Sequence, residues 1–302
     1  MSALRFRVLL PVALVALSAA CTPTTPSPDP TGSAAPSASA APGTTAPSPS
    51  APGSTTEPAP PANAAGALAV YYLANDRGEP KLVREFHRLS TGDGSAAAKV
   101  KAAVAEMLDG RTAYDPDYSS MWPASARVRG VTVAGDTVTV DLAGARINGD
   151  AGSFAAHQAV QQLVWTATAV SGKPKVRIHL DGKPVDELWG HVGTKDPLRR
   201  APAVDTLLAV WLIDPQEGAT VPKDFTLHVA GMVFEATMNY EVRRGATVVR
   251  EGFLTLDAGG PAQGEAKLRL SLPTGTYVIE VFDISENDGT KMFIDNHTVT
   301  VK

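Results

Sequence analysis

The chain has 302 residues, 44% of them hydrophobic, and a formal net charge of −4. This length holds two domains of ordinary size once the N-terminal low-complexity region is set aside. The charge lies on residues 66–302, where acidic side chains outnumber basic ones. A mildly acidic folded part argues against nucleic acid as a partner, because sequence-independent binding requires clustered positive charge.

Residues 1–20 have the layout of an export signal. Arg5 and Arg7 precede an apolar run at 8–17, and small residues then lead to Cys21. The apolar run is too short to cross a bilayer permanently. Cys21 is the only cysteine in the sequence, which rules out an intramolecular disulfide bond.

The end of this signal resembles the lipobox of bacterial lipoproteins, in which the cysteine is lipidated and becomes the mature N-terminus. Leu17 lies four residues before Cys21, whereas the usual leucine lies three before it. The resemblance implies a signal peptide at 1–20, acyl chains such as palmitate on Cys21, and anchoring to the extracytoplasmic face of the cell membrane. A buried cysteine in an uncleaved segment is the alternative.

Residues 21–65 are predicted to form a disordered linker behind the lipidated cysteine. Pro, Ser, Thr, Ala and Gly make up almost all of the segment. It lacks the aromatic and long aliphatic side chains whose burial would offset the entropy of ordering. As a random coil it would span roughly 35–40 Å, enough to hold the domains off the membrane. Its composition also permits O-glycosylation, but a bare flexible spacer is the simpler and favoured interpretation.

The folded sequence begins near residue 66 with alternating strand and helix patterns. The elements expected in chain order are strands at 68–73 and 82–89, a helix capped by Ser95 and ended by Gly110, an irregular connection at 111–126, a hairpin at 127–142, a helix at 154–170 capped by Ser153 and ended by Gly172, and a strand at 175–180. In the hairpin, valines alternate with threonines around a glycine turn, and Gly130 breaks the alternation as a bulge would. We therefore expect a small α+β domain.

This order resembles the GerMN domain family of spore germination proteins. The segments that carry the likeness are VYYL at 70–73, LDG at 108–110, VRGVTVAGDTVTVDL at 128–142, HQAVQQLVWTAT at 157–168 and VRIHLDGKPV at 176–185. The resemblance covers residues 66–190 and implies a small sheet with two helices. Its motifs are core and turn positions, so they indicate a fold and no chemistry. A sheet with only two helices would leave one face partly uncovered for a partner.

A polar segment at 190–203 separates a second, all-β unit. Seven strands are predicted, at 207–213, 225–231, 236–242, 247–256, 266–272, 276–284 and 292–301. Seven short strands at this spacing suggest an immunoglobulin-like sandwich, and Tyr277 lies where a tyrosine corner would place it. Each unit has its own strand pattern, so we expect two independently stable domains.

The second unit resembles the Gmad2 family, an immunoglobulin-like domain found with GerMN domains. The likeness rests on DPQEGATV at 214–221, GMVFEATMNYEV at 231–242 and FDISENDG at 282–289. It covers residues 207–302. Together the two resemblances imply a cell-envelope lipoprotein with a sporulation or germination role.

The sequence offers weak candidates for chemistry. Six histidines show no pair at metal-binding spacing, and His157 is expected to be partly buried on its helix. Glu235, and Glu286 with Asp288, are candidates for a catalytic carboxylate pair. A calcium ion could bind in a surface loop through Asp283, Asn287, Asp288 and Gly289. The four tryptophans could form a platform for carbohydrate: Trp122, Trp165, Trp189 and Trp211. Turn, edge and core positions explain each set more simply.

Two classes of function remain open. In the first, the chain is a non-catalytic envelope lipoprotein that associates with an envelope protein, with wall polymer or with itself. In the second, it is an envelope enzyme such as a cell-wall hydrolase. The sequence has no nucleophile elbow, phosphate loop or Rossmann glycine pattern, which favours the first class. We expect Cys21 lipidation, no catalytic residue, no cofactor and no metal.

Overall fold

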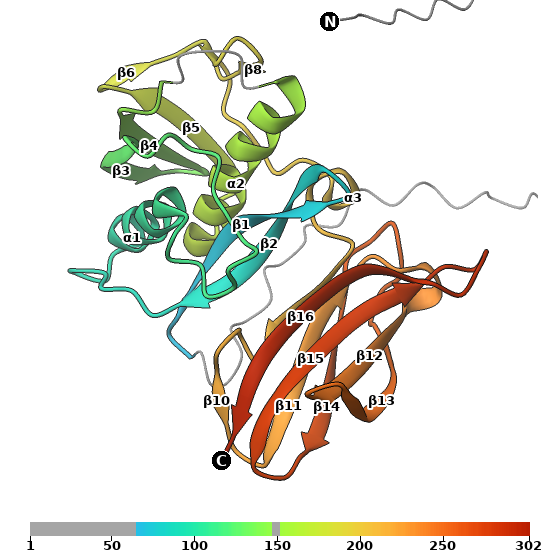
Figure 1. Cartoon of the computed structure of the whole chain (residues 1–302). Helices are drawn as coiled ribbons and strands as arrows, with labels where there is room; N and C mark the ends of the chain where they lie inside the picture. Colours follow the sequence, from blue (N-terminus) through green and yellow to red (C-terminus); the bar gives the residue numbers. More distant parts are fainter. Residues whose placement is uncertain (1–64, 147–151) are drawn as a thin grey trace, which may run out of the picture. The chain divides into compact units, whose positions relative to one another are not determined.

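The computed structural model describes residues 65–146 and 152–302 (Figure 1). The predicted signal peptide, Cys21 and nearly all of the predicted linker lie outside these residues. The described chain forms an α+β part at 65–194 and a β-sandwich part at 207–302, which confirms the predicted fold class. Within it, no helix combines the length and apolar character needed to span a membrane.

The α+β part places its two long helices between two β-sheets. Its elements are β1 (Leu68–Asp76), β2 (Glu79–His87), α1 (Ala96–Asp109), β3 (Arg127–Ala134), β4 (Thr137–Ala143), α2 (Ser153–Ser171), β5 (Lys175–Leu180), β6 (Lys183–Pro184), β7 (Glu187–Leu188) and β8 (Val192–Gly193). One sheet has the order β3-β4-β5-β6, with β4 and β5 parallel, and β1 and β2 form a separate antiparallel hairpin. Helices α1 and α2 pack between them (Figure 1).

The predicted hairpin is the β3–β4 pair. Val131 lies opposite Val140, and the register shifts between Val128 and Gly130, which confirms the predicted bulge. Val140 is buried, whereas its neighbour Asp141 lies on the outer, polar face of the sheet. The sheet thus has one face that the helices do not cover, as expected, and that face is polar.

The helix boundaries follow the predicted caps with one exception. The Ser95 hydroxyl accepts a hydrogen bond from a main-chain N–H of the first turn of α1, and Gly110 ends the helix in the left-handed conformation. Gly172 ends α2 in the same way. The prediction for the start of α2 is wrong by one residue, since Ser153 is already helical and Gly152 is the cap.

Helix α2 is buried on most sides, because sheets cover it from two directions. Two of its buried polar side chains form hydrogen bonds with strand β1. Gln162 donates to the Tyr71 carbonyl (3.0 Å), and Thr166 accepts from the Tyr71 N–H (3.1 Å). These side chains satisfy both main-chain groups of one residue of β1. His157 is exposed, so the prediction that it is partly buried is wrong.

Both edges of the β1–β2 hairpin are closed by other segments. On the β1 side, Leu73 and Ser119 exchange two main-chain hydrogen bonds (2.8 and 2.9 Å). On the β2 side, the Leu82 carbonyl accepts from the Leu208 N–H of the sandwich part (2.9 Å). A two-stranded hairpin is marginally stable alone, so this one depends on neighbours on both sides.

The sandwich part contains all seven predicted strands. After the short helix α3 (Ala203–Thr206) come β9 (Val210–Asp214), β10 (Thr220–Val221), β11 (Asp224–Gly231), β12 (Thr237–Arg244), β13 (Thr247–Thr255), β14 (Gly264–Ser271), β15 (Gly275–Ile284) and β16 (Lys291–Val301). One sheet has the order β10-β16-β15-β12-β13 and the other β14-β11-β9. The Tyr277 hydroxyl donates to the Pro273 carbonyl (2.9 Å), which confirms the tyrosine corner.

Strand β9 is buried on both faces and belongs to two hydrophobic cores. Val210 and Leu212 pack in the sandwich core, whereas Trp211 and Ile213 pack in the core of the α+β part. The run of consecutive apolar residues follows from this double burial, since a strand with one wet face would alternate. The boundaries 66–190 and 207–302 stay predictions, and the shared strand argues against the expectation that the two parts are independently stable.

Candidate functional site

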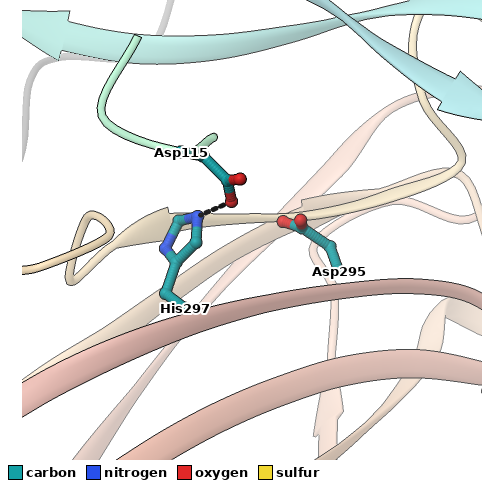
Figure 2. A group of neighbouring side chains, drawn as sticks. All are labelled: Asp115, Asp295 and His297. Atoms are coloured by element: carbon teal, nitrogen blue, oxygen red, sulfur yellow. Dashed lines mark ion pairs between the residues drawn. The ribbon is translucent and has the colours of Figure 1, made fainter. Parts of the chain in front are cut away.

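Three ionisable side chains converge where the two parts meet (Figure 2). Asp115 comes from the connection between α1 and β3, and Asp295 and His297 lie two residues apart on β16, hence on one face of the strand. All three residues are buried, and their ligand-type atoms lie within 4.8 Å of one another. We call this group the Asp–His cluster.

The orientation of the His297 ring is set by a main-chain carbonyl. Its Nδ1 lies 2.7 Å from the Pro215 oxygen, and because a carbonyl only accepts, Nδ1 carries the proton. The other ring nitrogen, Nε2, faces Asp115 Oδ2 at 3.5 Å. Nε2 has no hydrogen-bond partner among the described residues. Nε2 therefore faces the Asp115 carboxylate without a hydrogen bond to it.

Both carboxylates are held by fixed donors. Asp115 Oδ1 accepts from the Asp117 N–H (2.8 Å), which leaves Oδ2 toward His297. Asp295 Oδ2 accepts from the Leu212 N–H of β9 (2.6 Å), and the Tyr118 hydroxyl donates to the same carboxylate (3.2 Å to Oδ1). These contacts fix the direction of each oxygen before any ligand binds.

Burial makes negative charge costly in the cluster. It raises the pKa of the Asp115 carboxyl to about 6, although the Asp117 N–H and His297 act in the opposite direction. It also raises the pKa of Asp295, again against the effect of His297. Burial likewise raises the pKa of the Tyr118 hydroxyl, with Asp295 adding to the effect. A cation or a proton placed among these groups would relieve the cost.

A surface hollow of about 420 Å³ reaches the edge of the cluster. The residues that line it include Asp295, Tyr118, Asp117, Arg77 and Lys291. The hollow connects solvent with one of the three side chains. Small solutes can approach the cluster this way, whereas a polymer would be excluded from the buried Asp115 and His297.

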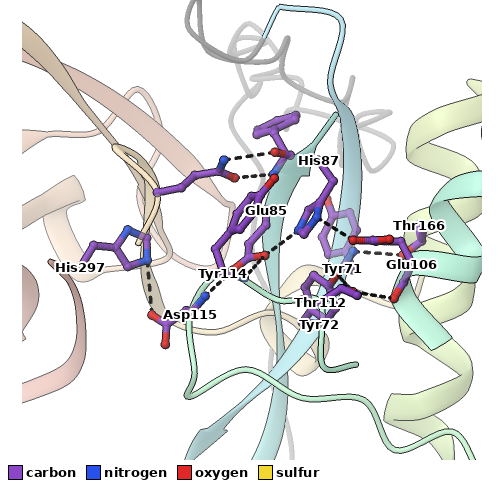
Figure 3. A network of polar contacts seen from close by, with 12 residues as sticks. Tyr71, Tyr72, Glu85, His87, Glu106, Thr112, Tyr114, Asp115, Thr166 and His297 are labelled. Carbon is purple, nitrogen blue, oxygen red and sulfur yellow. Dashed lines mark hydrogen bonds and ion pairs between the residues drawn. The ribbon is translucent and has the colours of Figure 1, made fainter. Parts of the chain in front are cut away.

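A second polar network supports the loop that carries Asp115 (Figure 3). The Glu85 carboxylate accepts the N–H groups of Tyr114 and Asp115, each at 3.0 Å, and lies 2.7 Å from His87 Nε2. His87 Nδ1 lies 3.0 Å from a Glu106 oxygen of α1, and the His87 ring stacks on Tyr114 at 4.3 Å. Strand β2 and helix α1 therefore position the Asp115 loop.

A buried ion cluster joins the two parts at another point. Arg84 of β2 reaches Glu265 of β14 (3.0 Å), and His228 of β11 lies 2.7 Å from the other oxygen of the same carboxylate. Although burial opposes it, the hydrogen bond from His228 and the charge of Arg84 lower the pKa of Glu265. This arrangement satisfies charges inside the interface and leaves little room for a substrate.

The structure does not bring the described candidate residues from the sequence together into a functional site. Cys21 lies outside the described residues. Trp122, Trp165 and Trp211 are buried and Trp189 packs edge-on against Trp122 (4.9 Å), so these residues belong to cores and do not form a carbohydrate platform. Local turn contacts occupy carboxylates of the proposed calcium loop: Asp283 accepts from its own chain neighbour and Asp288 from Thr290.

Sequence reasoning missed the Asp–His cluster because its members lie far apart in the chain. Asp295 and His297 form a visible D-x-H pair on a predicted strand, a spacing that puts both side chains on one face. Nothing local to Asp115 identifies its partners. A search for histidine pairs alone could not find a site with one histidine.

Two family models match the chain. Residues 69–186 match Germane, described as "Sporulation and spore germination", and residues 209–290 match Gmad2, described as "Immunoglobulin-like domain of bacterial spore germination". The chain thus carries a Germane (GerMN-like) domain followed by a Gmad2 immunoglobulin-like domain. These families support a germination-related role without enzymatic activity.

Comparison with solved structures gives matches of low identity and low TM-score. The tandem GerMN domains of the sporulation protein GerM from Bacillus subtilis are 18% identical over 47% of this chain and 45% of that one, with a TM-score of 0.35. This chain thus spans less than half of that structure. The first GerMN domain alone is 21% identical over 44% of this chain and 98% of that one (TM-score 0.33). A putative lipoprotein from Clostridium perfringens is 18% identical over 44% and 85%, respectively (TM-score 0.31). Comparison with curated proteins gives no significant match.

Proposed function

We propose that the chain is a non-catalytic, lipid-anchored protein of the cell envelope that acts by binding. The partner is another envelope protein, wall polymer or a second copy of the chain. One observation carries the proposal: a Germane domain and a Gmad2 domain follow an export-signal-like segment that ends at Cys21. The predicted linker would set the distance between the membrane and the two domains.

The burial of the polar clusters supports a non-catalytic role. The side chains of Asp115 and His297 are only 4% and 2% exposed. A wall hydrolase needs an acid or nucleophile that its polymer can reach, and these groups do not meet that need. They are better suited to holding the interface together.

The lipid anchor is tested by changing Cys21. We expect the full chain to fractionate with membranes and its N-terminal peptide to carry acyl chains by mass spectrometry, and we expect Cys21→Ser to release the protein. Cys21 is the only cysteine, so the substitution removes no disulfide bond. A Cys21→Ser protein that stays as firmly bound and an N-terminal peptide without lipid would contradict the anchor.

The binding role is tested by cross-linking in intact envelope. The full chain is cross-linked, purified under denaturing conditions and analysed for attached proteins and wall fragments, and the released Cys21→Ser protein serves as the control for location. Sedimentation over a wide concentration range reports self-association. A strict monomer that captures neither protein nor wall polymer, yet cleaves a wall-derived substrate, would reject this function and establish the enzyme instead.

A further inference from the structure

The distances within the Asp–His cluster are compatible with a metal site. At 3.5 Å, the separation of His297 Nε2 and Asp115 Oδ2 is longer than a good hydrogen bond. Two ligands of one tetrahedral zinc ion, each bonded at about 2.0–2.1 Å, lie roughly 3.3 Å apart. The observed separation is close to that value, and the third carboxylate lies within the same 4.8 Å group.

The groups around the cluster also resemble the surroundings of a metal site. A metal-bound histidine usually donates its second ring N–H to a carbonyl or carboxylate, as His297 Nδ1 does to Pro215 (2.7 Å). Ligand carboxylates are usually held by hydrogen bonds, as Asp115 and Asp295 are by main-chain N–H groups. The remaining nitrogen, Nε2, is buried, lacks a hydrogen-bond partner among the described residues and points into the cluster.

We propose that Asp115, Asp295 and His297 bind one divalent transition-metal ion, and that Zn²⁺ is the ion that fits them best. Zinc accepts imidazole nitrogen and carboxylate oxygen in four-coordinate sites. Calcium and magnesium prefer six or more oxygen ligands, which three side chains including an imidazole do not supply. Three protein ligands leave one position for water or another small ligand.

The ion would act as a clip between the two parts of the chain. Asp115 belongs to the α+β part, and Asp295 and His297 belong to the sandwich part. Binding would neutralise two buried carboxylates and tie the Asp115 loop to β16. Asp295 also lines the surface hollow of about 420 Å³, which brings solvent to the edge of the cluster. This role is independent of the partner proposed above.

The test uses the full, untagged chain, treated with chelator and titrated with zinc alone. We expect one Zn²⁺ per chain by calorimetric titration and a melting temperature that rises with zinc concentration. His297→Gln and Asp115→Asn each change a ligand, so each should weaken zinc binding by at least about 100-fold, the upper end of the cost of losing a group that only supports a ligand. His228→Gln is the matched control, because His228 is also buried and paired with a carboxylate but lies in the Arg84–Glu265 cluster. It should bind zinc as the unaltered chain does.

A spectroscopic measurement keeps the proposal testable if the variants do not fold. X-ray absorption of the zinc-loaded, unaltered chain should show a single imidazole with oxygen ligands at about 2.0–2.2 Å. Coordination by several imidazoles would place the ion on other histidines and overturn the proposal. Two further results would also overturn it: absence of saturable binding to the folded chain, or full binding by both His297→Gln and Asp115→Asn.

Discussion

Gln216 binds both main-chain polar groups of Phe86. Its Oε1 accepts from the Phe86 N–H (2.6 Å), and its Nε2 donates to the Phe86 carbonyl (3.1 Å). A side chain from the sandwich part thereby completes the outer edge of β2, as a neighbouring strand would. The interface between the two parts is thus continuous with the sheet hydrogen bonding of the first.

We predict that Gln216→Ala lowers the free energy of unfolding by about 1–3 kcal/mol, because two main-chain groups lose their partners. Denaturant unfolding of the full chain measures the change. Gln161→Ala is the matched control, since Gln161 also binds one main-chain N–H and one carbonyl, but at a more exposed place. Equal losses in both variants would show that the edge of β2 has no special dependence on Gln216.

The shared strand β9 predicts that residues 66–302 unfold in a single transition. Trp211→Ala should cost about 3–5 kcal/mol and lower the stability of both parts together, because its side chain fills the core of the other part. Differential scanning calorimetry of the full chain tests this. Trp189→Ala, at a half-buried position within the α+β part, should cost less. Two separate transitions, with Trp211→Ala shifting only one, would restore the expectation of independent domains.

The lowered pKa of Glu265 predicts a pH dependence of stability. Its folded pKa lies below the ordinary 4.5, so its ion cluster is fully stabilising above about pH 4.5 and loses its contribution as the pH falls through the folded value. Unfolding measured between pH 7 and pH 3 should therefore decline more steeply for the unaltered chain than for Glu265→Gln. The exposed Glu251→Gln should follow the unaltered curve. Parallel curves for Glu265→Gln and the unaltered chain would contradict the prediction.

Two glycines with similar backbone conformation predict different costs of substitution. A Cβ at Gly144 would lie 2.3 Å from the Ser125 carbonyl oxygen, whereas at Gly135 nothing lies within 4 Å. Both have positive φ, so each Gly→Ala change carries backbone strain of about 1 kcal/mol or more. We expect Gly144→Ala to be clearly the more destabilising in thermal unfolding. Similar losses would mean that the 111–126 connection can move away.

Local patterns in the sequence predicted most of the elements, because alternation, caps and turns are local physics. Ser95, Gly110 and Gly130 act as their types and positions indicate, and Tyr277 forms the expected corner. The burial of Gln162 was not foreseeable in this way. A glutamine on a helix is expected to face solvent, unless a strand edge without a partner lies beside it.

The parts that could not be predicted depend on distant segments. The predicted burial of His157 was wrong because helical spacing alone does not show which sides of a helix are covered. The Asp–His cluster depends on a loop and a strand from different parts of the chain. The consecutive apolar residues of β9 were a signal of burial on both faces, but the sequence did not show what covers the second face.

The double burial of β9 limits how this protein can be recombined with its relatives. A chimera spliced between the two parts, at 195–206, would carry Trp211 and Ile213 into a foreign α+β domain shaped for other side chains. A productive exchange would need to change those two residues together with their new neighbours and leave Val210 and Leu212 with their own sandwich. In such a chimera, Val210 and Leu212 of β9 would match the parent of the sandwich, whereas residues 211 and 213 would match the parent of the α+β domain.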